Sequence, residues 1–337
     1  MIHTLEITNR ILSCKHFDEI YKSITLLGNI KLRKVKEGYY VTNSLREWGF
    51  NQIQLISKKV DKKYKYNMMQ IKIILSPKRL INNNNDNIML NDDSENVMRI
   101  FNERIKRIHN TLPLLENWVV NRIDYAIDIF TKNVEEYIVL FQMGDKPKVF
   151  YELYCNKSKK RKQRNGSFYL VSKSVNINFY NKENERINKN GYSGNMNRVL
   201  RLEVQCKKMR TDYIKKKNKF ISKQLKYYFT ELESEKQIKE YYLKTVGRGD
   251  YYKLKKAIEL VAESNYSNLT KNKLIRTLNL ISECGGIWKA RDSVKWSEKS
   301  FHKYLELLRK LDINPVTIPE NWRLENLPNI LSDKVCL

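Results

Sequence analysis

The stretch from Ser174 to Glu185 most constrains the fold, because its first seven residues alternate between polar and apolar types. Every second residue from Val175 to Phe179 is apolar, and the residues between them are polar, ending at Tyr180. A period of two predicts a β-strand with one face buried. A charged turn is predicted to follow, so the tyrosine stands at the end of the strand's polar face.

Two further predicted strands carry carboxylates on their polar faces. The strand from Trp118 to Ile129 places Asp124 and Asp128 on one face, because side chains alternate across a strand. The strand from Val199 to Cys206 carries Glu203. With these strands on either side of the tyrosine strand, the sequence predicts a phenol beside a small group of carboxylates.

A tyrosine in such a setting suits cleavage of a DNA strand by attack of the phenol oxygen on phosphorus. The phenol has a pKa of about 10 in water and must lose its proton. Lys182, two residues after Tyr180, is predicted to stabilise the phenolate or the phosphate, and Glu185 to accept a proton or orient Lys182. Tyr169, on a neighbouring predicted hairpin strand, stays a competing nucleophile.

The predicted metal ligands are Asp124, Asp128 and Glu203, which would hold a cation that polarises the phosphate. The four histidines are isolated from one another, and no cysteine pair has zinc-ligand spacing. A site built mainly from carboxylates favours a hard divalent cation, Mg²⁺ or Mn²⁺.

Each of these residues also has a structural interpretation. Asp124 and Asp128 could face solvent at a sheet edge, Arg122 could pair with Asp124, and Arg201 could pair with Glu203. The chain has 21 tyrosines, so a single tyrosine is far more often a packing or surface residue. The combination of residues, and no single member, points to catalysis.

The chain is strongly basic, with 64 Lys and Arg against 37 Asp and Glu, a net charge of +27 spread over the whole sequence. Nucleic acid, single- or double-stranded, is the expected partner because it is the commonest polyanion. A solvated basic surface is the alternative. Two basic clusters adjoin the predicted site strands and are expected to bind DNA phosphates. Their residues are Lys157, Lys159, Lys160, Arg161, Lys162, Arg164, Lys207, Lys208 and Arg210.

The order of predicted elements gives an α+β fold, a central mostly antiparallel sheet with helices on one face, followed by a helical C-terminal domain. A catalytic domain is predicted over residues 1–235 and a helical DNA-binding or accessory domain over residues 236–337. Helices predicted at residues 270–283 and 297–311 could form a module like a helix-turn-helix, with Lys299, His302 and Lys303 on its outer face.

Five scattered cysteines indicate reduced thiols in a cytosol-like compartment, so a cytoplasmic location is expected. The N-terminal residues lack the pattern of a signal peptide. No apolar run approaches the length of a membrane span, so no membrane partner is expected.

At these motifs the sequence resembles the rolling-circle replication initiators of plasmids and filamentous phages, namely the Rep_trans proteins and the gene II/X proteins. Their pattern is an Arg-x-Asp strand, a Tyr-x-Lys-x-x-Glu motif and an Arg-x-Glu strand. Here these are Arg122-Ile-Asp124, Tyr180-Asn-Lys182-Glu-Asn-Glu185 and Arg201-Leu-Glu203, in that order. The opening Met-Ile-His-Thr resembles the phage group, and so does the Leu-Asp312-Ile-Asn-Pro segment, although many members have Gly where this chain has Asp312.

The resemblance implies a site-specific nick at a replication origin, a 5′-phosphotyrosine intermediate, a free 3′-OH that serves as primer, and later strand closure. It implies that Tyr180 is the nucleophile and that Asp124 and Glu203 bind metal. The motifs cover about residues 118–207. The assignment of Asp128 as a ligand rests on strand geometry.

Two other functions remain open alongside an initiator. A non-catalytic DNA-binding replication regulator would need the basic surface but not the tyrosine and carboxylates. A mobilisation relaxase or a transposase would use the same tyrosine chemistry on another DNA site. The predicted partners are DNA, a host helicase that unwinds the nicked strand, and a second copy of the chain in a homodimer.

Overall fold

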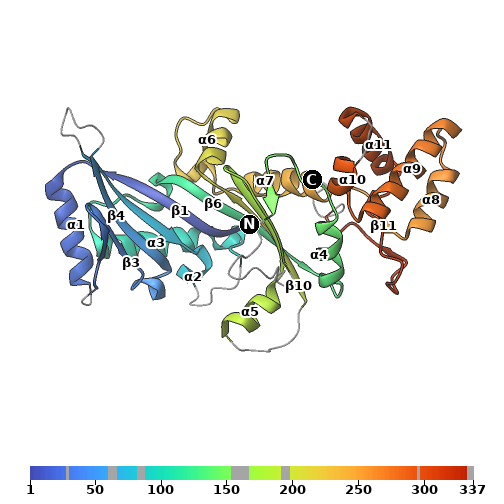
Figure 1. Ribbon diagram of the computed structural model, residues 1–337. Helices are drawn as coiled ribbons and strands as arrows, with labels where there is room; N and C mark the ends of the chain where they lie inside the picture. The colour runs from blue at the N-terminus through green and yellow to red at the C-terminus, as the bar shows by residue number, and fades with distance from the viewer. Residues whose placement is uncertain are drawn as a thin grey trace. The chain divides into compact units, whose positions relative to one another are not determined.

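The computed structural model describes residues 1–27, 30–59, 67–81, 88–152, 167–190, 198–293 and 297–331 (Figure 1). It has a ten-stranded sheet with associated helices and a helical C-terminal region, which confirms the predicted α+β class. In the part of the chain that the structure describes, no helix has the length and apolar character needed to cross a bilayer.

The strands of the large sheet follow the order β2-β3-β4-β5-β1-β6-β10-β9-β8-β7, and β11 pairs with β12 in a separate ribbon. The strands are β1 (Ile2–Ile11), β2 (Arg33–Lys36), β3 (Tyr39–Thr42), β4 (Phe50–Lys59), β5 (Asn67–Leu75), β6 (Val119–Phe130), β7 (Tyr151–Glu152), β8 (Ser167–Val171), β9 (Val175–Asn181), β10 (Val199–Cys206), β11 (Tyr251–Tyr252) and β12 (Asn326–Leu327). The three strands predicted to carry the site are neighbours in the order β6, β10, β9. Both carboxylate strands therefore lie on the same side of the tyrosine strand, and the prediction that they flank it on either side is wrong.

The helices within the described ranges begin and end at the following residues. They are α1 (Cys14–Leu26), α2 (Pro77–Ile81), α3 (Ser94–Ile108), α4 (Val134–Gln142), α5 (Lys182–Asn190), α6 (Lys208–Lys217), α7 (Glu231–Thr245), α8 (Leu254–Glu263), α9 (Asn268–Cys284), α10 (Ile287–Ser293) and α11 (Glu298–Lys310).

The chain forms two compact units. The first unit comprises Met1–Ile127, Lys173–Asn176 and Glu203–Gln237, and the second comprises Asp128–Ser172, Ile177–Leu202 and Ile238–Leu337. The boundary predicted near residue 235 lies beside the last crossing of the chain from one unit to the other, after Gln237. The chain also crosses at four earlier points, because β6, β9 and β10 each contribute residues to both units.

In the first unit, α1 and α3 cover one face of the sheet (Figure 1). The ring of Phe17 in α1 lies 6.5 Å from that of Tyr40, and the ring of Phe101 in α3 lies 5.6 Å from Phe50 and 5.8 Å from Trp118. Alternation along the strands sends their apolar side chains to this face and their polar side chains to the other. The second face therefore carries the polar residues, including Asp124.

In the second unit, the predicted charged turn after Tyr180 is wrong, because helix α5 begins there at Lys182. The side-chain oxygen of Asn181 accepts hydrogen bonds from the backbone N–H groups of Glu183 and Asn184, at 3.0 and 3.2 Å. An asparagine in this position caps a helix, and acidic residues in the first turn favour the positive end of the helix dipole. Strand β9 is also more buried than predicted, with Asn176 and Tyr180 only 8% and 7% exposed.

Two helix starts in the structure are defined by different residues. Ser297 caps α11, because its hydroxyl accepts a hydrogen bond from the backbone N–H of Ser300 at 3.2 Å. Helix α3 begins at Ser94, and Asp93 precedes it in the capping position.

The helical part of the second unit has a core formed where α8, α9 and α11 meet. Its fully buried residues are Ala257, Val261, Leu274, Leu278, Leu308 and Ile313. Asp312, where many of the resembling initiators have Gly, has a backbone φ of 58°. This left-handed conformation costs most residues free energy but is tolerated by Asp, so the turn after α11 keeps the shape that glycine would allow.

Replacing Leu278 by Ala is expected to lower the free energy of unfolding by about 2–5 kcal/mol, because the change leaves a cavity in this core. Leu269→Ala is the matched control on the same helix, since Leu269 is 75% exposed and its loss should change stability by less than about 0.5 kcal/mol. Urea unfolding followed by circular dichroism measures both. Equal effects of the two substitutions would contradict the assigned core.

Candidate active site

Five residues of the second unit lie close together where β9 ends and α5 begins, and we call them the tyrosine cluster. Four of them were predicted site residues, and Arg201 is the fifth. They are Asp128, Tyr180, Lys182, Glu185 and Arg201. The Tyr180 side chain has two cations near it, because Arg201 hydrogen-bonds to it and the Lys182 ammonium lies 5.9 Å from its ring centre. Each cation has a carboxylate partner within the cluster.

The start of α5 determines how Lys182 and Glu185 lie. Residues three apart on a helix share a face, so the Lys182 ammonium forms an ion pair with the Glu185 carboxylate. Lys182 is only 2% exposed, whereas the Glu185 side chain is 27% exposed. The expected relation between these two residues is therefore present, with Glu185 holding Lys182 beside Tyr180.

Arg201 is the member of the cluster that the sequence analysis did not place in the site. Its side chain is fully buried and donates two hydrogen bonds to Asp128, from Nε to Oδ1 at 2.5 Å and from Nη2 to Oδ2 at 2.6 Å. The structural alternative was a pair between Arg201 and Glu203, whereas the structure pairs Arg201 with Asp128. Burial by itself lowers the pKa of the guanidinium, but Asp128 and Tyr180 raise it above its ordinary value, so Arg201 stays charged.

A second group lies in the first unit, on the polar face of the sheet, and we call it the carboxylate cluster: His3, Arg122, Asp124 and Glu203. Asp124 is fully buried and accepts two hydrogen bonds from Arg122, at 2.7 Å from Nε and 2.5 Å from Nη2. Glu203 is 5% exposed, and its Oε1 lies 3.4 Å from His3 Nδ1. Gln205 Nε2 donates to the same oxygen at 3.2 Å.

The two carboxylates of this cluster titrate in opposite directions. Burial, together with the nearby charge of Glu203, raises the pKa of Asp124 to about 6 although Arg122 opposes the shift. Burial also acts to raise the pKa of Glu203, but hydrogen bonds from His3 and Gln205 and the charge of Arg122 together lower it to about 2. Near neutral pH both groups therefore carry negative charge, and within the four residues of the cluster Arg122 is the member that is always positively charged.

The predicted metal ligands are not gathered into one group. Among the residues that the structure describes, no three His, Cys, Asp or Glu side chains are placed so that they could hold a metal ion. Asp124 and Asp128 lie four residues apart on β6, roughly 13 Å along the strand, which is too far for both to bind one cation. Asp128 also has both oxygens bound by Arg201.

Asp124 and Glu203 have the donor chemistry that Mg²⁺ or Mn²⁺ requires, and His3 adds a nitrogen donor that suits Mn²⁺. Asp124 fits only once Arg122 releases one of its oxygens, because both accept hydrogen bonds from that arginine. His3 was missed by the sequence analysis, which judged the histidines by their distance along the chain. Its position on the first predicted strand was the available signal.

The predicted DNA-binding residues fall in four different settings. Residues 157–164 lie outside the described residues. Lys207 is half-buried, and burial together with the nearby charge of Arg122 lowers its pKa, which puts Lys207 close to the carboxylate cluster. Lys208 is exposed at the start of α6, whereas Arg210 is buried and donates to Gln237 Oε1 at 2.9 Å.

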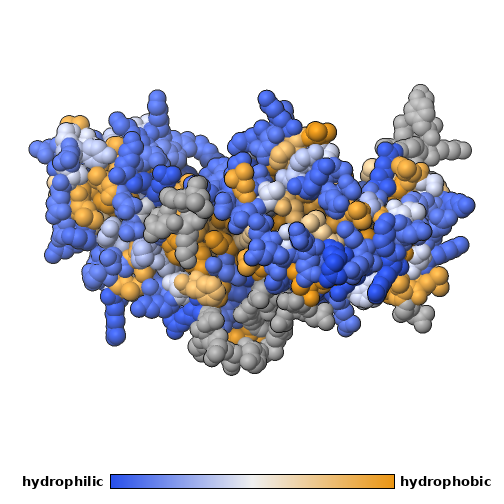
Figure 2. Space-filling view, turned by 180° about the vertical axis from the view of Figure 1, so that it is seen from behind, coloured by the Kyte–Doolittle hydropathy of each residue, from blue (hydrophilic) through white to orange (hydrophobic). Residues whose placement is uncertain are grey.

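The face shown in Figure 2 is mostly hydrophilic, with smaller apolar patches. The competing nucleophile, Tyr169, is half-buried on β8. Its position leaves the choice between the two tyrosines to experiment.

Compared with known proteins, the sequence matches no protein-family model, and no curated protein matches it significantly. The resemblance to replication initiators therefore rests on the short motifs themselves and on the side chains that they bring together.

Replacing Asp128 by Ala is expected to lower the free energy of unfolding by about 3–5 kcal/mol, because it leaves the buried charge of Arg201 uncompensated. The measurement is made in EDTA, so that bound metal does not contribute. Asp292→Ala is the control in the same unit. The Asp292 side chain is 69% exposed, so this substitution should change the free energy of unfolding by less than about 1 kcal/mol. Unchanged stability of the Asp128 variant would show that the ion pair is not a structural requirement.

Stability should also depend on pH through Glu203. The folded pKa of Glu203, about 2, lies below its ordinary 4.5, so its contribution is present above pH 4.5 and lost as the pH falls toward 2. The Glu203→Gln variant lacks this contribution. The difference in unfolding free energy between the wild type and the variant should therefore shrink by up to ~3 kcal/mol as the pH falls from 4.5 toward 2.

Urea midpoints measured below pH 4.5 in EDTA test this dependence. Asp124 acts in the opposite sense and at higher pH, because its folded pKa of about 6 exceeds the ordinary 3.8. Glu95→Gln, at an exposed position on α3, should follow the wild-type curve. A difference between wild type and Glu203→Gln that stays constant with pH would rule out the assigned role of Glu203.

Proposed function

We propose that this protein is a tyrosine-dependent DNA strand transferase, an enzyme that cuts a DNA strand by forming a bond between a tyrosine and the 5′-phosphate. Within that class, the motif order favours an initiator of rolling-circle replication that nicks and rejoins one strand at an origin. The observation that supports the proposal is that both Arg201 and Lys182 lie close to Tyr180.

In the proposed reaction the phenol oxygen of Tyr180 attacks the phosphorus, and the bond from phosphorus to the 3′ oxygen breaks. The phenol proton passes to a carboxylate. We assign this role to Glu185 and not to Asp128, because Glu185 is partly exposed and pairs with Lys182, whereas both oxygens of Asp128 are bound by Arg201. The 3′ oxygen leaves with a proton taken from water. Arg201 and Lys182 stabilise the negative charge that develops on the phenol oxygen. Strand closure reverses these steps.

The proposed metal is Mg²⁺ or Mn²⁺, with Asp124 and Glu203 as the carboxylates that would hold it once Asp124 turns away from Arg122. When bound, such a cation supplies positive charge that polarises the scissile phosphate. The residues of the chain provide the remaining functions: Tyr180 forms the covalent bond, its two cations stabilise charge, and Lys207 lies where it can contact a DNA phosphate beside the carboxylate cluster.

Recognition of the origin requires base contacts, which we assign to the helical part of the second unit. Lys299, His302 and Lys303 are exposed on α11, as the sequence predicted. Helix α10 lies in the connection between α9 and α11, so the connection is longer than that of a compact helix-turn-helix. A host helicase and a homodimer remain proposals that rest on the chemistry of unwinding and on the resemblance alone.

The second candidate is a DNA-binding regulator without catalytic activity. The observation that favours it is the low exposure of Tyr180, 7%, which limits access of a phosphate to the phenol oxygen. A relaxase or transposase would share the chemistry of an initiator and differ in the DNA site.

A nicking assay tests the proposal. The protein is incubated with a supercoiled plasmid that carries its own coding region, with Mg²⁺, Mn²⁺ or EDTA. We expect metal-dependent nicking and a covalent protein–DNA adduct that survives denaturation. Tyr180→Phe and Glu203→Ala should abolish both, because they remove the nucleophile and a metal ligand.

Tyr169→Phe is the matched control, since it removes a tyrosine hydroxyl from the neighbouring strand and should leave nicking intact. Loss of the adduct in Tyr169→Phe but not in Tyr180→Phe would transfer the role to Tyr169. Binding without nicking under both metals would contradict an enzyme and favour the regulator.

A further inference from the structure

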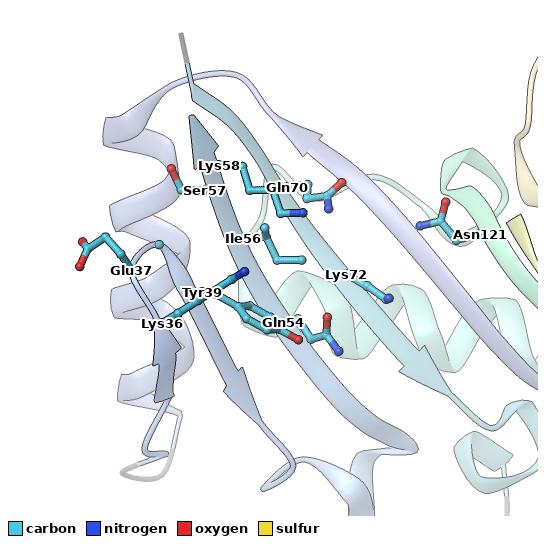
Figure 3. Close-up of a pocket in the computed structure, with 11 residues that line it drawn as sticks. Lys36, Glu37, Tyr39, Gln54, Ile56, Ser57, Lys58, Gln70, Lys72 and Asn121 are labelled. Atoms are coloured by element: carbon cyan, nitrogen blue, oxygen red, sulfur yellow. The ribbon is translucent and has the colours of Figure 1, made fainter. Parts of the chain in front are cut away.

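The polar face of the first unit contains a hollow of about 310 Å³ that neither cluster includes (Figure 3). It lies on strands β2 to β5 and reaches β6, and we call it the sheet hollow. Its lining is polar and basic, with one aromatic ring. The lining residues are Lys36, Glu37, Gly38, Tyr39, Gln54, Ile56, Ser57, Lys58, Gln70, Lys72 and Asn121.

The register of the strands explains why these residues share one face. Gln54 of β4 lies opposite Lys72 of β5, and Ile56 of β4 lies opposite both Gln70 of β5 and Tyr39 of β3. The residues between them in sequence, such as Leu55 and Ile71, are buried on the face that α1 and α3 cover. The hollow therefore lies on the face away from these helices.

Gly38 keeps one end of the hollow open. Its φ is +65°, and a Cβ atom there would lie 2.2 Å from the backbone oxygen of Ser57. The Gly38 carbonyl accepts a hydrogen bond from the Ser57 N–H at 2.6 Å. Only glycine allows the β2–β3 turn to approach β4 so closely, so the turn forms a wall without a side chain.

Lysines give the hollow its charge. Lys36 and Lys58 are exposed, while Lys72 forms an ion pair with Glu6 at 2.6 Å. Lysines on an edge strand also prevent pairing between sheets, and this accounts for the basic β2. It does not account for Lys58 and Lys72, which lie on the inner strands β4 and β5.

The remaining lining suits a nucleotide base. The side-chain amides of Gln54 and Gln70 each offer donors and an acceptor, and the ring of Tyr39 offers an aromatic face. Gln54 is 7% exposed and donates to Gln52, whose Nε2 donates to Asn43 Oδ1 at 3.1 Å, so its amide is oriented by a chain of hydrogen bonds. A volume of roughly 300 Å³ is at the small end for ligand sites and suits one base.

The hollow adjoins the carboxylate cluster within the first unit. Asn121 lines it and precedes Arg122, whose guanidinium binds Asp124. Asn121 Nδ2 also donates to Thr8 Oγ1 at 3.2 Å, and Glu6 of the same strand lies opposite Arg122. A strand that occupied the hollow would thus lead along β6 toward Asp124.

We infer that the sheet hollow binds one unpaired base of single-stranded DNA, with Tyr39 stacking on the base and Lys36 and Lys58 contacting the flanking phosphates. The inference deepens the proposed function, on which it rests, by assigning a recognition site to the strand that is cut. Paired bases do not expose their faces for stacking, so duplex DNA does not fit this site.

The test is binding of a fluorescently labelled 20-nucleotide single strand, measured by anisotropy in EDTA beside its duplex and an RNA of the same sequence. Lys36→Glu combined with Lys58→Glu is expected to weaken single-strand binding about tenfold or more and to reduce the slope of log Kd against log salt by about 1.4. Tyr39→Ala should weaken it about tenfold, and Tyr39→Phe should restore it, because stacking needs the ring alone.

Lys15→Glu combined with Lys22→Glu is the matched control, since both lysines are exposed on α1, on the other side of the sheet. Circular dichroism checks that each variant is folded. Equal losses in the two double variants, unchanged binding in both, or equal losses for duplex would overturn the inference, and tighter binding of the RNA would overturn the assignment to DNA. Nicking is measured separately with Mn²⁺, so a protein that nicks but does not use the hollow is distinguished from one that does not nick.

Discussion

The structure of the candidate site depends on the pairing of buried charges on β6 and β10. Asp124 and Arg201 are both fully buried, and an isolated charge in that position would cost far more free energy than a small protein can spare. Each is compensated by two short hydrogen bonds, Asp124 by Arg122 and Arg201 by Asp128. The Arg122–Asp124 and Arg201–Asp128 pairs therefore allow central strands of the sheet to carry charged side chains. Strands with apolar side chains alone would offer no charged group to a substrate.

The two clusters differ in their charge balance, and this difference fits different roles. In the tyrosine cluster, Arg201 and Lys182 are offset by Asp128 and Glu185, so the phenol lies in a neutral group in which both cations are adjacent to it. In the carboxylate cluster, Asp124 and Glu203 exceed the single permanent charge of Arg122. A net negative group attracts a cation, whereas a neutral group with adjacent cations stabilises a phenolate.

Periodicity was enough to predict the strands and several helices, because alternation and helical spacing are local properties. It predicted β6, β9 and β10 and the helices α9 and α11. It failed after Tyr180, since the capping role of Asn181 was not recognised and the charged residues were assigned to a turn. The pairing of Arg122 with Asp124 lies within one strand and was foreseen as an alternative, whereas the partner of Arg201 depends on how β10 aligns with β6, which no single strand determines. For the same reason His3 was missed, although it lies beside Glu203.

Phosphate contacts alone cannot distinguish one DNA sequence from another, and the sheet hollow offers contacts of a different kind. The excess of 27 positive charges can hold DNA of any sequence, because phosphates are the same at every position. A nuclease that cuts at one site must also read bases, and a flat sheet offers few ways to do so. Gln54, Gln70 and Tyr39 combine directional amides with a stacking surface, and Asn121 joins them to the strand that carries Asp124. A base held there would fix which phosphate reaches the carboxylates, so placement of the bound strand and the position of Asp124 would depend on the same strand, β6.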